Sequence, residues 1–142
     1  MAFARSLTDE QWGIETGNEG WTVKDIMAHI GKANDQLFQG LLRQVIAGEK
    51  VDTEIFRTVD TDGENMAGVE ARRGMPPADV IAEYEEAGEE MQHLLSQLTD
   101  EHEHLTQDDP PFVLKSFLPV IENESHSIEH LRQMQAAVEV RA

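Results

Sequence analysis

Apolar side chains recur at steps of three and four residues along three stretches of the chain, and this spacing predicts three amphipathic helices. The first begins at Thr22, where the segment TVKD has the pattern of a helix cap, and ends near Gly48. The second begins at the proline pair 76–77, and the third has Ser116 as its cap with Pro119 in its first turn. The apolar stripes are Val23, Ile26, Ile30, Leu37, Leu41 and Val45; Val80, Ile81, Tyr84, Ala87, Met91, Leu94, Leu95 and Leu98; and Val120, Leu131, Met134 and Val138.

The segments between these stripes predict short helices and loops. Thr8, with Gln11 three residues later, predicts a capping box on a first helix that is very short. The connection 49–76 is polar at first, and its later part, ENMAGVEARR, predicts a short helix that Gly74 ends. No segment alternates apolar and polar residues over a useful length, so we expect no sheet and an all-α fold.

Length and composition indicate one domain that spans residues 1–142. Hydrophobic residues make up 39% and charged residues 27%, which is a globular balance. The chain has no apolar run of the roughly 18 residues that a membrane span needs, and its start does not have the pattern of a signal peptide. We therefore expect a cytoplasmic protein. The chain has no cysteine, so any metal must be held by histidine nitrogen and carboxylate oxygen.

The charge of the chain argues against two classes of partner. Acidic residues number 28 and basic residues 11, which gives a formal net charge of −17. Nucleic-acid binding depends on lysine and arginine side chains that neutralise phosphates, and an anionic membrane surface attracts the same cations. The pair Arg72-Arg73 is too small to offset the acidic field. We expect a small-molecule substrate, with neither a nucleic acid nor a membrane as partner.

Two histidines of the last predicted helix are spaced for metal binding. His126 and His130 are four residues apart, so both rings lie on one helical face about 6 Å apart. Two imidazoles at that spacing can reach one metal ion at about 2.0–2.1 Å. However, for six histidines in a chain of this length, the number of such pairs expected by chance is roughly 0.2. A solvated or hydrogen-bonded pair is therefore an open interpretation as well.

A third histidine could complete the site. His29 also lies at the border of an apolar stripe, and a neighbouring helix could carry it to the HxxxH pair. Three histidines leave a fourth metal position open, as in catalytic zinc sites, although spacing alone does not establish that the three meet. Acceptors for imidazole N–H groups would be Asp25 and either Glu122 or Glu129, unless these are solvated acids. We interpret His93, His102 and His104 as surface residues, and Trp12 and Trp21 as core residues.

Two segments carry a resemblance to a known family. GWTVKDIMAHI at 20–30, followed by ESHSIEHLRQM, resembles the DinB/YfiT-like metalloenzymes, which are related to the N-terminal domain of mycothiol-dependent maleylpyruvate isomerase. The resemblance extends from LTDEQW through VEARRGMPPADVIAEY to LRQM and so covers nearly the whole chain. The short first helix departs from the family pattern.

This resemblance implies a four-helix bundle of up-down-down-up topology, with a short extra helix in the long connection. It also implies a divalent metal, nickel or zinc, bound by His29, His126 and His130. The implied activity is that of a transferase or isomerase that uses a low-molecular-weight thiol such as mycothiol or bacillithiol, or that of a hydrolase. Because the chain has no cysteine, such a thiol must arrive as a cosubstrate. The alternative is a non-catalytic stress protein that binds metal or a small ligand.

The short first helix also bears on assembly. It leaves apolar surface on its neighbours that a second subunit could cover, and members of the family are often dimeric. We therefore expect a homodimer.

Overall fold

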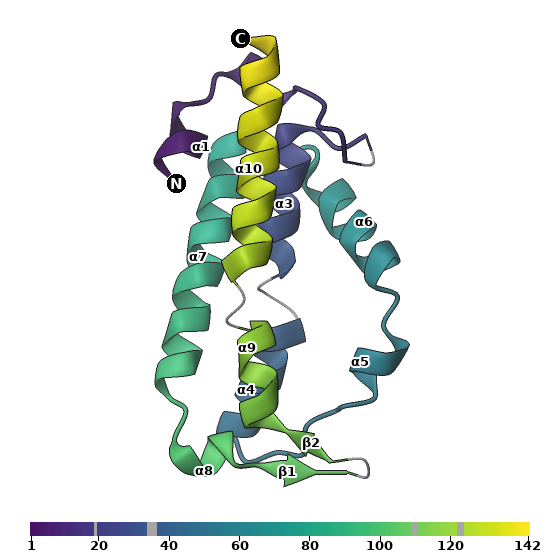
Figure 1. Cartoon of the computed structure of the whole chain (residues 1–142), viewed down its shortest axis with the longest axis vertical. Helices are drawn as coiled ribbons and strands as arrows, with labels where there is room; N and C mark the ends of the chain where they lie inside the picture. The colour runs from purple at the N-terminus through teal and green to yellow at the C-terminus, as the bar shows by residue number, and fades with distance from the viewer. Residues whose placement is uncertain (19, 34–36, 109–110, 122–123) are drawn as a thin grey trace.

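The computed structural model describes residues 1–18, 20–33, 37–108, 111–121 and 124–142. Helices dominate it, as predicted, and the two longest run along the long axis of the molecule (Figure 1). In chain order the elements are α1 (Ala2–Ser6), α2 (Asp9–Trp12), α3 (Val23–Ala33), α4 (Leu37–Ile46), α5 (Ile55–Thr58), α6 (Thr61–Arg72), α7 (Pro77–Ser96), α8 (Asp100–Glu103), β1 (Thr106–Gln107), β2 (Phe112–Val113), α9 (Leu114–Ile121) and α10 (Glu124–Arg141).

The helix α3 is the centre of the packing, because it contacts α6, α7 and α10. Both α3 and α7 run downward in Figure 1 and α10 runs upward, while α4 and α9 lie below α3 and α10. The up-down-down-up order as a whole stays a prediction, because its first helix is represented only by the short α1 and α2. Whether α3 continues into α4, and α9 into α10, depends on residues 34–36 and 122–123, which lie outside the described residues.

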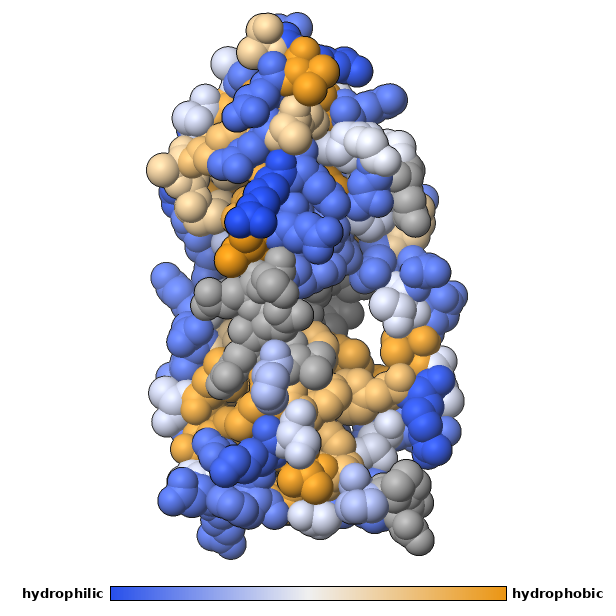
Figure 2. Space-filling view, in the orientation of Figure 1, coloured by the Kyte–Doolittle hydropathy of each residue, from blue (hydrophilic) through white to orange (hydrophobic). Residues whose placement is uncertain are grey.

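The core is divided into two clusters along the long axis. One cluster joins α3, α7, α10 and the N-terminal segment, and both tryptophans, Trp12 and Trp21, are buried in it, as predicted. The second cluster joins α4, α7 and α9, with four phenylalanines partly buried at its edge: Phe38, Phe56, Phe112 and Phe117. Figure 2 shows a largely hydrophilic upper half, whereas apolar side chains reach the surface over the lower half.

Local sequence determines several helix ends as expected. The Thr8 hydroxyl accepts from the backbone N–H of Gln11, whose side chain accepts from the Thr8 N–H, so the predicted capping box is present. Gly48 has φ +71° and ends α4 with bonds from its own N–H to the Val45 carbonyl and from the Glu49 N–H to the Gln44 carbonyl. Pro77 is the first residue of α7, as predicted.

The long connection is more helical than predicted. The helix α6 begins after Asp60, whose carboxylate caps it by accepting from the Gly63 N–H, and it ends at Arg72, just before the predicted terminator Gly74. The short helix α5 precedes it. Among the described residues, no helix is both long and apolar enough to cross a membrane.

Two predictions about the segment before the last helix are wrong. A two-stranded sheet is present, in which Thr106 pairs with Val113; strands of two residues are too short to show an alternating pattern. Ser116 is not a cap, because α9 begins at Leu114, and Pro119 consequently lies inside the helix rather than in its first turn. Leu114 is fully buried and its N–H donates to the Leu105 carbonyl, so the chain enters the helix directly from the hairpin.

Candidate metal centre

Three histidines from two neighbouring helices meet at one point. His29 comes from α3, and His126 and His130 come from α10, one helical turn apart. One ring nitrogen from each lies within 4.8 Å of the others. The ring centroid of His29 lies 5.4 Å from that of His126 and 4.9 Å from that of His130. The three rings therefore meet at one point, and that they bind a metal stays a prediction.

The spacing of the ring nitrogens fits a small divalent ion. The Nε2 atoms of His29 and His126 lie 3.3 Å apart. Two nitrogens at about 2.0–2.1 Å from a tetrahedral zinc ion are separated by about 3.3–3.4 Å. The same distance also fits a hydrogen bond from one imidazole to the other. Neutral nitrogen donors at this spacing could therefore hold zinc or a similar metal.

The cluster is closed on one side and open on the other. His29 and His130 are only 6% and 9% exposed, whereas His126 is exposed. Desolvation lowers the pKa of His126 below its usual value, the charge of His130 acts in the same direction, and Glu129 opposes both. A lowered pKa favours the neutral imidazole, which is the form that binds metal. A small molecule could approach the cluster from the side of His126.

Trp21 packs against the buried end of the cluster. Its ring lies 5.1 Å from that of His29, tilted by 47°. Within the described part of the chain, the Trp21 Nε1 is the only buried side-chain nitrogen or oxygen without a hydrogen-bond partner. The sequence predicted burial for Trp21 but not this contact. Trp21 precedes the cap of α3, so helical periodicity does not place it against His29.

A glutamine holds one of the metal-ligand candidates. The Nδ1 of His130 lies 2.9 Å from the Oε1 of Gln133, three residues further along α10. Sequence reasoning missed this residue because it considered only acidic acceptors. The i, i+3 spacing on one helix was the signal that could have found it.

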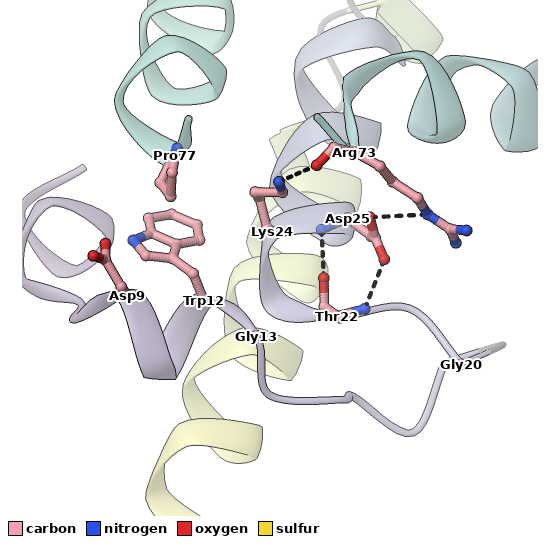
Figure 3. A pocket seen from close by; sticks show the side chains of 9 residues that line it. All are labelled: Asp9, Trp12, Gly13, Gly20, Thr22, Lys24, Asp25, Arg73 and Pro77. Carbon is pink, nitrogen blue, oxygen red and sulfur yellow. Dashed lines mark hydrogen bonds and ion pairs between the residues drawn. The ribbon is translucent and has the colours of Figure 1, made fainter. Parts of the chain in front are cut away.

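None of the acidic residues predicted as acceptors is described in contact with a histidine of the cluster. Asp25 accepts from the Thr22 N–H at 3.0 Å, and its other oxygen lies 3.6 Å from the Arg73 Nε (Figure 3). Asp25 therefore caps α3 and pairs with the end of α6. Glu129 is exposed, and Glu122 lies outside the described residues.

The remaining histidines and the arginine pair are structural or exposed. His93 and His104 are exposed, and the His102 ring accepts from the Thr99 N–H as part of a capping box on α8. Arg72 pairs with Glu83 of α7 and donates to the Gly68 carbonyl. The ion pair with Glu83 ties α6 to α7, and Arg73 pairs with Asp25, so no contact among the described residues assigns the arginine pair to an anionic substrate.

Two pockets lie away from the histidine cluster. One, of about 560 Å³, is lined by Trp12, Lys24, Asp25, Arg73 and neighbouring residues (Figure 3). The other, of about 750 Å³, is lined by Phe56, Phe112, Phe117 and the charged residues around them. Each has the volume of a small-molecule site, but the three histidines are not among the lining residues of either.

The fold and the cluster together define an all-α protein with a three-histidine centre that could hold a divalent metal. The comparison with protein families is compatible with this description. The chain belongs to the mycothiol maleylpyruvate isomerase N-terminal domain family, a DinB-like family, whose sequence pattern matches residues 1–119. The match includes His29 and ends before the HxxxH pair. No curated protein and no solved structure gives a significant match.

Proposed function

We propose that this protein is a divalent-metal-dependent enzyme in which His29, His126 and His130 hold nickel or zinc. The convergence of the three rings, with one of them exposed, carries the proposal. The proposed reaction is the transfer of a group to a low-molecular-weight thiol, or the isomerisation of a substrate with such a thiol as cosubstrate. In a third variant, hydrolysis, water takes the place of the thiol. The proposed setting is the cytoplasm, and the proposed substrate is a small molecule.

The chain supplies the ligands and the access to them. Three imidazoles are neutral, so they leave the charge of a bound divalent ion uncompensated. When bound, such an ion would act as a Lewis acid and would lower the pKa of a thiol or a water molecule that binds to it. His29 and His130 would hold the ion from the buried side, and exposed His126 borders the approach.

The thiol is inferred from the family, and its role as a cosubstrate follows from the composition of the chain. The family name refers to a mycothiol-dependent isomerase. The chain itself has no cysteine, so it cannot provide a sulfur nucleophile. A thiol used in the reaction must therefore bind as a cosubstrate.

A conjugation screen tests this proposal. The protein would be stripped of metal, reloaded with zinc or nickel, and assayed with mycothiol, bacillithiol and glutathione against a panel of small electrophiles. We expect turnover that requires both the metal and a thiol, and that His126→Ala abolishes. His93→Ala, which removes an exposed histidine of α7, is the matched control and should retain activity.

Two outcomes would contradict the enzyme proposal. Turnover that is equal in the metal-free and the loaded protein would exclude the histidine centre as its site. Tight metal binding by four protein ligands, with no thiol-dependent or hydrolytic turnover, would instead support a non-catalytic protein that binds metal. Among the described residues the cluster has three members, which favours the open site of an enzyme.

A further inference from the structure

We infer that Gln133 is a positioning residue that fixes the tautomer of His130 and thereby presents its Nε2 as a metal ligand. The part of this inference that concerns the metal depends on the function proposed above. The part that concerns the tautomer depends only on the chain.

The chemistry of the amide determines the direction of the hydrogen bond. The Gln133 Oε1 can only accept, so the Nδ1 of His130, at 2.9 Å, must carry the proton. The lone pair then lies on Nε2, which is free to face the other two rings. His130 is 9% exposed and Gln133 is half-buried, so water competes weakly for this bond. The i, i+3 spacing on α10 holds both side chains on one face.

The neutral amide has a consequence for the metal. Metal-binding histidines usually donate their second N–H to a carboxylate, a backbone carbonyl or water. A carboxylate would add negative charge beside the site and make the imidazole a stronger donor. An amide oxygen orients the ring without that charge, so the ligand set remains neutral. Compared with a carboxylate at the same position, Gln133 therefore makes a bound ion a stronger Lewis acid but lowers the affinity of the site for it.

His130 differs in this respect from His126. Within the described residues, the hydrogen-bond contact of His126 is with the His29 ring, and its neighbour Glu129 is exposed. The orientation of His126 is therefore less restricted than that of His130. Replacement of Gln133 should affect the buried, fixed ligand rather than the exposed one.

Three variants test the inference. Gln133→Leu removes the acceptor, Gln133→Glu keeps an acceptor that cannot donate, and Gln135→Leu makes the same change as the first at an exposed position of α10. Long-range ¹H–¹⁵N correlation spectra of the metal-free protein report the tautomer of each histidine. Competition with a chromogenic chelator measures the dissociation constant for zinc.

In the wild type and in Gln135→Leu, we expect His130 to be protonated on Nδ1. Gln133→Leu should give a mixture of tautomers and weaken zinc binding by about 10-fold to 100-fold. Gln133→Glu should keep the Nδ1 tautomer and bind zinc more tightly than the wild type, because its hydrogen bond is charge-assisted.

Two results would overturn the inference. One is an Nε2-protonated His130 in the wild type; the other is zinc affinity in Gln133→Leu equal to that in Gln135→Leu. Weaker binding by Gln133→Glu would mean that the amide N–H₂ faces the ring, which also contradicts it. If the wild type binds no zinc, the proposed function fails, while the tautomer spectra still decide the role of Gln133.

Discussion

Removal of the metal should lower the stability of the loaded protein by a defined amount without unfolding it. The residues that fill the core around α3, such as Val23, Ile26 and Ile30, are fully buried by apolar contacts that do not involve the histidines. Metal should therefore stabilise the fold only through its preferential binding to the native state. His126→Ala isolates that contribution, because His126 is exposed and its removal leaves no cavity in the core.

The magnitude follows from linkage. At a free metal concentration of 100 times the dissociation constant, binding adds about 2.7 kcal/mol to the free energy of unfolding. For 142 residues the unfolding entropy is about 0.3 kcal/mol per kelvin, so the midpoint temperature should rise by about 9 °C.

Circular dichroism during thermal unfolding, with zinc or with a chelator, measures both quantities. The wild type and His93→Ala should show the shift in midpoint, and His126→Ala should lose it while it keeps its helical signal. If a chelator alone melts the wild-type helices, the metal is structural and the apolar core does not hold the fold by itself. A full shift in His126→Ala would equally refute it, because the exposed histidine would then contribute nothing to binding.

Other consequences concern pH, packing, backbone geometry and assembly. Metal affinity should fall as the pH decreases, because protonated imidazole cannot bind; with the pKa of His126 lowered, competition at that ring should begin below about pH 6.5. Titrations with equal affinity at pH 7.5 and pH 5 would indicate carboxylate ligands. Met134→Ala empties a fully buried position and should cost about 2–5 kcal/mol in denaturant unfolding; a cost under about 1 kcal/mol would contradict the packing. Gly48→Ala, at φ +71°, should cost about 1–2 kcal/mol, whereas Gly40→Ala, within α4 and with open space around it, should be neutral or stabilising. Sedimentation should show a homodimer, and a monomer at high micromolar concentration would exclude it.

The parts of this molecule that are determined locally could be predicted from the sequence. The Thr8 capping box, the glycine that ends α4 and the proline that begins α7 each act within one turn of helix. The relative position of the His126 and His130 rings is also determined locally, because the two residues are four apart on one helix. That His29 meets them depends on how α3 packs against α10, and the family resemblance, rather than the periodicity, supported this contact.

The features that the sequence did not predict depend on tertiary contacts, or they involve segments of too few residues to show a periodic pattern. The hairpin has two residues in each strand, and α9 begins at Leu114 because burial and a bond to Leu105 draw that residue inward. The contact of Trp21 with His29 lies outside any helical period. Gln133 was missed because a neutral side chain was not considered as a partner for a metal ligand.

X-ray absorption spectroscopy of the zinc-loaded protein is the decisive test of the three-histidine centre, because it reports the atoms that bind the metal. We predict three nitrogen ligands at about 2.0–2.1 Å and one oxygen ligand, which a sulfur atom at about 2.3 Å replaces when a thiol is added. Each of His29→Ala, His126→Ala and His130→Ala should lose the metal, whereas His93→Ala should give the wild-type spectrum. A shell of oxygen ligands, or a spectrum that His126→Ala leaves unchanged, would contradict the three-histidine centre.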